Sequence, residues 1–317
     1  MSKVIKPGAL VAGGAVRVVS PASSPDRNAF GRGVSELERL QYRVRLASPE
    51  MHPDGYFAGP AAKRAAELQA ALLDDDNQAV IAPRGGYGTG PVLDLLKFAR
   101  PPRAKLVVGY SDLTMLHAYL WRRWRWVTLY GPMVASGFAK GADSPFGYDR
   151  VSWINAVGGE RRRWEVGLGG EALFRGQASG TVIGGCLAVL QTTIGTPWEF
   201  DARGAILLLE DVGVKPYQVD RMLVHLAQAG KFRGVRGIIL GEFPESNPTG
   251  NSTVTVRDVC HRVLAPLRVP VVYGSAVGHT ARAMVTVPLG VRGRLTASGE
   301  GKLEILEAAV IAPGKKK

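Results

Sequence analysis

The stretch Leu106-Val107-Val108-Gly109-Tyr110-Ser111-Asp112-Leu113 joins an apolar run to a polar turn and then to a helical pattern. Leu106–Gly109 predicts a buried strand, and Asp112–Trp121 predicts a helix. Ser111 falls on the tight turn between the two. A strand, a tight turn and a helix in this order form one unit of an α/β sheet.

The rest of the first half repeats this alternation. Strands are predicted over Val16–Ser20 and Ala79–Ala82, and helices over Arg32–Leu40 and Gly90–Phe98. The pattern is typical of a doubly wound α/β layer, in which binding and catalytic groups gather where strands end and helices begin. Two such junctions are unusually rich in glycine and polar residues. They are Arg84-Gly85-Gly86-Tyr87-Gly88 and Gly109-Tyr110-Ser111-Asp112.

The second half mixes strands and helices with less regularity. The predicted strands and helices are Ala205–Leu209, Val219–Ala229, Gly237–Leu240, Asp258–Leu264 and Val271–Tyr273, followed by turn-rich β segments to Ile311. Residues from about Ser136 to Ser179 are rich in glycine and charge and show little periodicity. We therefore expect an N-terminal domain over 1–150, a linker over 151–180 and a smaller mixed α/β domain over 181–317.

Composition narrows the class of protein. The chain has 317 residues, of which 46% are hydrophobic, enough for two globular domains. Cys186 and Cys260 are far apart and form no CxxC pair, which argues against a disulfide framework or a thiolate zinc site and fits a reducing compartment. Because no apolar run approaches the roughly 20 residues that span a bilayer, we expect a soluble protein. Lys3 and Lys6 precede the apolar run Ala9–Val16, which we interpret as leading into a first strand rather than as a signal peptide.

The net charge of +13 raises nucleic acid, anionic membrane and acidic small molecules as partners. Basic residues are scattered, apart from Arg161-Arg162-Arg163, Arg122-Arg123-Trp124-Arg125 and Lys315-Lys316-Lys317. No zinc-finger, RNP or helix-turn-helix pattern accompanies the charge, so we expect neither a nucleic-acid nor a membrane partner. An anionic peptide substrate would be attracted by such a surface.

Ser111 stands where a nucleophilic serine would stand in an α/β hydrolase. The turn exposes its hydroxyl, and the amide of Asp112 at the helix start can donate a hydrogen bond to a developing oxyanion. The motif departs from G-x-S-x-G because Leu113 occupies the position of the second glycine. A plain helix N-cap at Ser111 therefore remains an alternative.

The glycine-rich loop at Arg84–Gly90 admits three interpretations. Pro91 stands where the dinucleotide fingerprint needs its third glycine, and no Gly-Lys-Ser/Thr of a P-loop follows. The remaining choices are a plain turn, a divergent phosphate loop and an oxyanion loop with a glycine amide as donor.

A serine nucleophile needs a base and an acid that orients the base. His117 and His225 lie in helical patterns, whereas His52 and His261 lack a glycine-rich or strand-end context. His279 follows a strand and the loop Gly274-Ser275-Ala276-Val277-Gly278, where functional residues concentrate.

The acid has three candidates. Glu210 and Asp211 end the apolar strand that precedes them, and Glu242 ends another strand. Neighbouring strand residues point to opposite faces, so only one of Glu210 and Asp211 can face the histidine. Neither HExxH nor another His/carboxylate ligand spacing is present, which argues against a catalytic metal.

Taken in order, these segments resemble the LD-carboxypeptidase family of serine peptidases along nearly the whole chain. The segments that carry the resemblance are Ser20-Pro21-Ala22-Ser23-Ser24, Arg84-Gly85-Gly86-Tyr87-Gly88, Gly109-Tyr110-Ser111-Asp112, Leu209-Glu210-Asp211-Val212 with Pro216-Tyr217 and Asp220-Arg221-Met222-Leu223, and Gly278-His279 with Pro288-Leu289-Gly290. The resemblance implies a Ser111–Glu210–His279 triad, with Gly86 and Asp112 as oxyanion donors and no cofactor or metal.

The resemblance also implies a flavodoxin-like N-terminal layer, a smaller mixed α/β C-terminal domain and a site at their interface. The implied substrate is a cytoplasmic murein tetrapeptide that loses its terminal D-alanine in cell-wall recycling, and a homodimer is the default assembly. Cys186 stands where the family usually has asparagine, and Val214 replaces a common second glutamate. A peptidase that inactivates a peptide–nucleotide antibiotic, of the microcin-immunity type, and a non-catalytic protein that binds anionic ligands remain alternatives.

Overall fold

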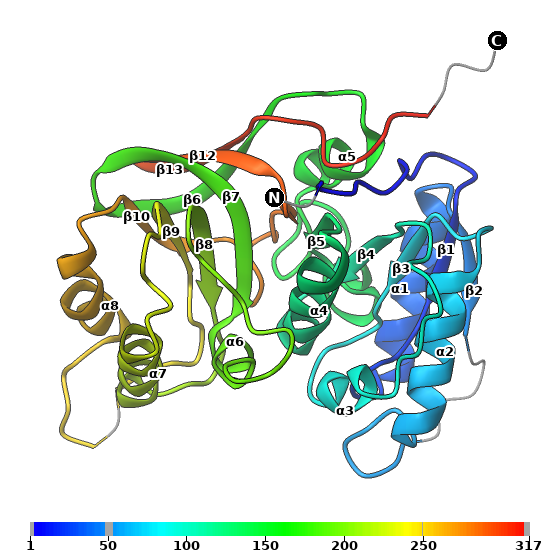
Figure 1. Cartoon of the computed structure of the whole chain (residues 1–317), viewed down its shortest axis with the longest axis horizontal. Helices are drawn as coiled ribbons and strands as arrows, with labels where there is room; N and C mark the ends of the chain where they lie inside the picture. Colours follow the sequence, from blue (N-terminus) through cyan, green and yellow to red (C-terminus); the bar gives the residue numbers. More distant parts are fainter. Residues whose placement is uncertain (1–2, 48–52, 249, 314–317) are drawn as a thin grey trace.

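The computed structural model describes residues 3–47, 53–248 and 250–313, so His52 and Lys315–Lys317 lie outside the described residues. Two β-sheets lie side by side, an open sheet and a closed barrel (Figure 1). The fold is therefore a mixed α/β fold.

The open sheet has the strand order β11-β5-β4-β3-β1-β2. Its strands are β1 (Ala15–Val18), β2 (Arg43–Leu46), β3 (Ala79–Ile81), β4 (Leu106–Gly109), β5 (Thr128–Tyr130) and β11 (Val287–Leu289). β1 to β5 pair in parallel, whereas β11 pairs with β5 in the antiparallel sense. Parallel strands place their carboxyl ends along one edge, so the turns after β3 and β4 meet there.

Helices cover both faces of this sheet because its strand residues are apolar on both sides. Val80 and Val107 belong to a core shared with α2 (Ala61–Leu73), α3 (Thr89–Leu93) and α4 (Thr114–Trp124). Their neighbours Ile81 and Val108 face the other side. The elements on that side are α1 (Arg27–Arg39), the π-helical turn η2 (Val134–Phe138) and α5 (Arg150–Gly158).

The barrel closes in the order β10-β6-β13-β12-β7-β8-β9. Its strands are β6 (Trp164–Phe174), β7 (Gly176–Cys186), β8 (Ala205–Glu210), β9 (Gly237–Gly241), β10 (Val271–Ser275), β12 (Arg292–Ala297) and β13 (Glu300–Ile305). β7, β8, β9 and β10 run parallel, and the other pairs are antiparallel.

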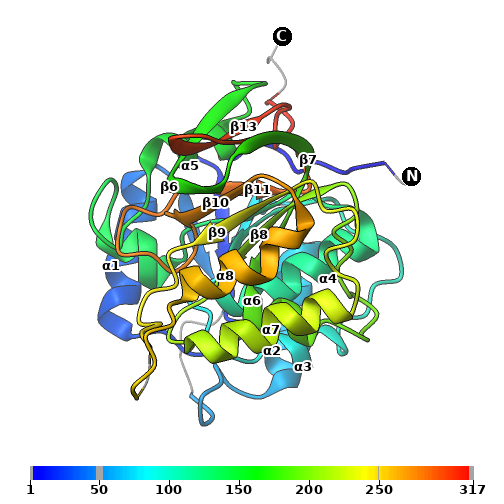
Figure 2. The same cartoon turned by 90° about the vertical axis from the view of Figure 1, so that its left-hand side faces the viewer.

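Three helices cover the outside of the parallel part of the barrel (Figure 2). They are α6 (Leu187–Thr192), α7 (Pro216–Gln228) and α8 (Val256–Leu264), which continues into the 3₁₀ turn η3 (Ala265–Leu267). Leu207 and Leu209 point outward to these helices, while Ile206 and Leu208 point into the barrel core. Glu210 is the last residue of β8, and its side chain contacts Tyr130 of β5 in the open sheet.

The structure does not contain the linker that the sequence predicted over 151–180. These residues form most of α5, all of β6 and the first part of β7. The burial of β6 alternates along the strand, but Gly167, Gly169 and Gly170 interrupt its apolar pattern. At Gly170 a side chain is excluded, because a Cβ atom would lie 2.5 Å from the carbonyl oxygen of Tyr273 on β10. Close strand approach therefore explains Gly170, one of the glycines that suggested a linker.

Two predicted helices have different bounds in the structure. The helix expected over Gly90–Phe98 is shorter and covers Thr89–Leu93. The helix expected over Asp112–Trp121 starts as a 3₁₀ turn, η1 (Ser111–Leu113), and continues as α4. The other predicted strands and helices are present within a few residues of their expected ends.

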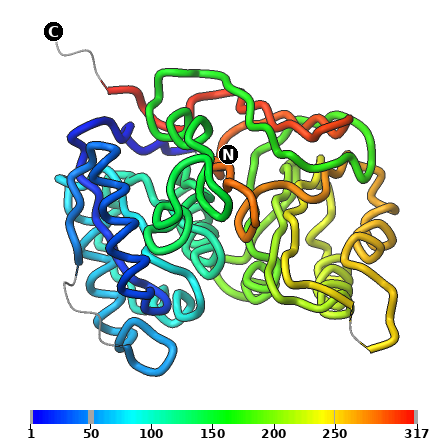
Figure 3. Tube along the Cα trace, turned by 180° about the vertical axis from the view of Figure 1, so that it is seen from behind, coloured from blue at the N-terminus to red at the C-terminus, as the bar shows by residue number. Residues whose placement is uncertain are grey.

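After β10 the chain returns from the barrel to the open sheet for one strand, and then goes back to the barrel. β11 leaves the barrel region to complete the open sheet, and Figure 3 shows this orange segment passing between the two sheets. Ile5 bridges to Trp126, and Gly8 bridges to Ile311, so the two terminal segments lie side by side. Across residues 3–47, 53–248 and 250–313, no helix is long and apolar enough to cross a membrane.

Candidate active site

Ser111 lies at the carboxyl end of β4 in a left-handed backbone conformation, with φ of 61°. A non-glycine residue in this region stores strain and is held there by its surroundings. The amide of Ser111 donates a hydrogen bond to the hydroxyl oxygen of Tyr130, at 3.2 Å. The predicted strand–turn–helix unit is confirmed, and the serine lies at its turn.

The glycine-rich loop packs directly against this turn. A Cβ atom at Gly85 would lie 2.8 Å from Cβ and 2.9 Å from Oγ of Ser111, so only glycine fits. Gly86 has a φ of 93°, and a Cβ atom there would collide with the side chain of Ser23. The hydroxyl of Ser23 instead accepts a hydrogen bond from the amide of Tyr87, at 3.1 Å. Within the described ranges the amides of Gly86 and Asp112 make no hydrogen bond, so both can donate to a ligand.

Two buried charges hold the loop in place. The carboxylate of Asp112 accepts a hydrogen bond from the amide of Thr89 at 2.8 Å. Arg64 is a buried arginine on α2, and its guanidinium donates to the carbonyl oxygens of Gly59, at 2.9 Å, Gly88, at 2.6 Å, and Pro21. Burial lowers the pKa of Arg64, and the charge of Asp112 opposes that shift. The sequence reasoning missed Arg64, because the helical segment around it suggests a solvent-exposed arginine.

Glu210 and His279 form a pair on the barrel side. His279 Nδ1 lies 2.8 Å from Glu210 Oε2, and the amide of His279 donates to the same oxygen at 2.9 Å. The glycines around the pair are required, since a Cβ atom at Gly278 would lie 2.4 Å from Cδ of Glu210, and one at Gly241 would lie 2.5 Å from its Cβ. Glu210 is fully buried, while His279 keeps part of its ring exposed.

The charges of this pair stabilise each other. Burial alone would raise the pKa of Glu210, but the charge of His279 and the hydrogen bonds from His279 and Tyr130 outweigh it and hold that pKa below its ordinary value. Burial alone would lower the pKa of His279, but Glu210 outweighs that effect and raises it. The arrangement favours a carboxylate next to an imidazole of increased basicity.

Tyr130 connects the two halves of the site. Its hydroxyl donates to Glu210 Oε1 at 2.5 Å and accepts the amide hydrogen of Ser111. Burial first, and then the negative charge of Glu210, raise the pKa of Tyr130 well above its ordinary value, so its hydroxyl stays protonated. Tyr130 thus links the serine turn to the acid across the boundary between the sheets. Sequence reasoning did not identify it, because it ends an apolar strand without a motif.

Ser111 and His279 line one pocket of about 580 Å³, a size suited to a small ligand. The remaining lining residues are Asp26, Arg84, Gly85, Gly86, Tyr110, Met133, Ala135, Ser136, Cys186, Ala188, Val189, Asp211 and Val212. The ring of Tyr110 meets the imidazole of His279 edge to face, with centroids 5.0 Å apart. The two junctions and the histidine loop singled out in the sequence therefore meet at one cavity.

The other two candidate acids do not contact His279. Asp211 accepts hydrogen bonds from the amides of Ala188 and Val212, both at 2.9 Å. Glu242 accepts from the hydroxyl of Thr280 at 2.6 Å and pairs with Arg282. Glu242 thus anchors the loop that follows the histidine.

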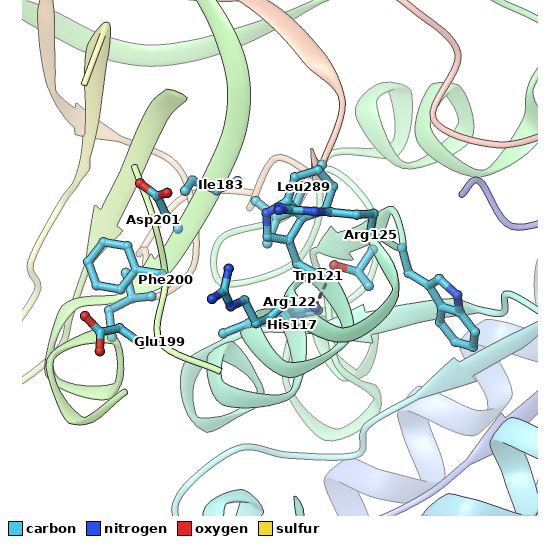
Figure 4. A pocket seen from close by; sticks show the side chains of 15 residues that line it. His117, Trp121, Arg122, Arg125, Ile183, Glu199, Phe200, Asp201 and Leu289 are labelled. Atoms are coloured by element: carbon cyan, nitrogen blue, oxygen red, sulfur yellow. Dashed lines mark hydrogen bonds between the residues drawn. The ribbon is translucent and has the colours of Figure 1, made fainter. Parts of the chain in front are cut away.

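The remaining histidines have structural roles or lie elsewhere. Both ring nitrogens of His117 are paired, with Thr128 Oγ1 and with the carbonyl oxygen of Gly109, each at 2.9 Å. Burial lowers the pKa of His117 to about 4. His225 contacts Gln191, and the ring of His261 packs against Phe174. His117 lines a second pocket between α4 and the barrel (Figure 4), which contains neither Ser111 nor His279.

Cys186 is buried, and burial together with the charges of Glu210 and Asp211 raises the pKa of its thiol well above the ordinary value. Cys260 is also buried. Among the described residues, no three His, Cys, Asp or Glu side chains form a group that could hold a metal ion.

Comparison with known proteins identifies the family of this chain. The LD-carboxypeptidase N-terminal domain matches residues 16–131, and the LD-carboxypeptidase C-terminal domain matches residues 179–295. The chain belongs to the LD-carboxypeptidase family. It is 31% identical over 310 residues to a Bacillus subtilis protein named "Probable murein peptide carboxypeptidase", covering 96% of this chain and 95% of that one.

Solved structures share the fold. The muramoyltetrapeptide carboxypeptidase from Oxalobacter formigenes superimposes with a TM-score of 0.81 at 28% identity, over 93% of this chain and 99% of the other. The microcin C7 self immunity protein MccF superimposes with a TM-score of 0.85 at 24% identity, over 97% of this chain and 100% of that chain. This family member is therefore a peptidase with the fold that these proteins share.

Proposed function

We propose that this protein is a cytoplasmic serine carboxypeptidase that hydrolyses an L,D-peptide bond and releases the terminal D-alanine of murein tetrapeptide during cell-wall recycling. The observation that carries the proposal is that the strained Ser111 turn and the His279–Glu210 pair open into one pocket. Membership of the LD-carboxypeptidase family supports it.

In the proposed mechanism, His279 takes the proton from the Ser111 hydroxyl, and the serine oxygen attacks the carbonyl carbon of the scissile bond. Glu210 holds the Nδ1–H of the imidazole and stabilises the imidazolium that forms. The amides of Gly86 and Asp112 donate to the oxyanion of the tetrahedral intermediate. The imidazolium then gives its proton to the leaving amine, and D-alanine departs. Water, activated by His279, hydrolyses the acyl-enzyme and restores Ser111.

The proposal includes a finer view of the fold. The order β2-β1-β3-β4-β5 supports a flavodoxin-like N-terminal layer, with the site at its boundary with the barrel. A homodimer and independence from cofactor or metal complete the proposal.

The test is release of D-alanine from purified murein tetrapeptide. The wild-type protein should give D-alanine and tripeptide in equal amounts, and Ser111→Ala should give neither while keeping the wild-type melting temperature. Activity should persist in a strong chelator. A Ser111→Ala protein that keeps more than a few per cent of turnover, or an activity that chelation removes and a divalent ion restores, would reject the serine mechanism. Binding of the tetrapeptide without product would favour the non-catalytic alternative.

A second candidate function is inactivation of a peptide–nucleotide antibiotic. Its support is the fold shared with MccF, one structure of which is a complex with glutamyl sulfamoyl guanosine. The same assay with an aminoacyl sulfamoyl nucleoside separates the two functions. Faster hydrolysis of that compound than of the tetrapeptide would favour the second candidate.

A further inference from the structure

We propose that Arg84 binds the terminal carboxylate of the peptide substrate and thereby makes the enzyme a carboxypeptidase; this inference rests on the function proposed above. In a peptide the terminal carboxylate carbon lies less than about 4 Å from the carbonyl carbon of the last peptide bond, given standard backbone dimensions. The group that recognises it must therefore line the same pocket as Ser111.

The charges within the pocket favour Arg84 as the group that binds the terminal carboxylate. Among the described residues that line it, Arg84 is the only lysine or arginine, and His279 is committed to proton transfer. Asp26 and Asp211 also line the pocket and add two carboxylates to it. An incoming carboxylate would be repelled by these groups unless a fixed cation faced it.

Geometry places the guanidinium beside the proposed oxyanion site. Arg84 directly precedes Gly85, which contacts Ser111, and Arg84 Nε lies 3.8 Å from where a Cβ atom at Gly86 would be. One terminal nitrogen of Arg84 donates to the carbonyl oxygen of Ser24 at 3.2 Å, which fixes the side chain. In the part of the chain that the structure describes, Nε and the other terminal nitrogen make no hydrogen bond, so they can grip a carboxylate with two parallel bonds.

Two other donors at the pocket are already engaged. The first turn of α6 reaches the pocket at Ala188, but Asp211 accepts that amide. The hydroxyl of Ser136 faces the carbonyl oxygen of Met133 at 3.4 Å. The amides of Gly86 and Asp112 are needed for the oxyanion. Arg84 is left as the donor with free capacity and a charge of the right sign.

The experiment compares two tetrapeptides that differ only at the end, one with terminal D-alanine and one with D-alaninamide. Wild-type enzyme should prefer the free acid in kcat/KM by about 10- to 150-fold, the range of a hydrogen bond to a charged group. Arg84→Gln should lose that factor on the acid and keep its rate on the amide, and Arg84→Lys should fall between. Arg122→Gln, which removes one exposed positive charge on α4, is the control and should behave as wild type.

Binding to the Ser111→Ala protein, measured by calorimetry, gives an independent arm. The acid should bind more tightly than the amide, and adding Arg84→Gln should remove the difference. Equal losses on acid and amide, an unchanged preference in Arg84→Gln, or no binding of the acid would overturn the role of Arg84. If wild type hydrolyses neither peptide while the binding difference persists and depends on Arg84, the proposed function fails and the assignment of Arg84 stands.

Discussion

Glu210 is a fully buried carboxylate with a partner for each oxygen, Tyr130 on one and His279 on the other. A buried charge that loses a partner is strongly destabilising, because the remaining groups cannot turn to water. The contacts of Glu210 therefore bind the serine turn, through Tyr130, to the histidine loop. A substitution of Glu210 should therefore affect both the stability of the protein and its catalysis.

Glu210→Gln should lower kcat by about 10³- to 10⁴-fold, because the imidazole loses the anion that orients and stabilises it. Asp211→Asn should cost much less, since Asp211 contacts backbone amides and not His279. Glu242→Gln should also cost less, through a looser loop after the histidine. Turnover of folded, purified variants measures the difference. A larger loss in Asp211→Asn than in Glu210→Gln would remove Glu210 from the role of acid.

The pH dependence of the reaction reports on the same pair. Burial alone would lower the pKa of His279, yet Glu210 raises it above the ordinary value of 6.5. The base must be neutral to accept the serine proton, so kcat/KM should rise with pH through a midpoint above 6.5. In Glu210→Gln the midpoint should move to lower pH. A wild-type midpoint below 6.5, or no movement in the variant, would contradict the coupling.

At the scale of elements, the glycines in the loop after β3 allow this loop to pack closely against the turn after β4. The methyl group in Gly85→Ala would press on Ser111, and overpacking of this kind destabilises by about 1–3 kcal/mol. We expect kcat to fall about 100-fold as the hydroxyl is displaced. Kinetics combined with thermal unfolding measure both effects.

Gly31→Ala is the matched control. Gly31 lies inside α1, and a Cβ atom there would meet no atom within 4 Å apart from its chain neighbours and the backbone of its own helix. The substitution should leave kcat unchanged and stabilise the protein by about 0.5–1 kcal/mol, because alanine is the better helix former. If Gly85→Ala kept full activity, the contact between the loop and the serine would not matter for catalysis.

Sequence patterns were sufficient where an element is locally encoded. The β4 turn at Ser111 and the strand that ends at Glu210 carry their own apolar runs and turn residues, and the structure has both. β6 was missed because its partners, β10 and β13, are distant in sequence and because its glycines hide the alternation. Arg64 was missed because no local pattern tells a buried arginine from an exposed one.

At the scale of the whole molecule, the net charge of +13 predicts electrostatic attraction of an anionic peptide. The Debye length falls from about 30 Å at 0.01 M salt to about 10 Å at 0.1 M. KM for the tetrapeptide should therefore rise several-fold over this range, while kcat stays constant. A tetrapeptide whose side-chain carboxyl groups are amidated, with its terminal carboxylate kept, should show a weaker dependence. Equal salt dependence for both peptides would contradict attraction by overall charge.

Because the site is divided between the two sheets, its residues are synthesised at different times. Ser111 comes from the open sheet, whereas His279 lies far along the chain, and β13 must still pair with β6 before the barrel closes. At about 5–20 residues per second, His279 leaves the ribosome roughly 10 to 30 s after Ser111. The nascent chain thus exposes its serine before its base exists. In the proposed mechanism, the chain therefore has no peptidase activity until its last strands are made.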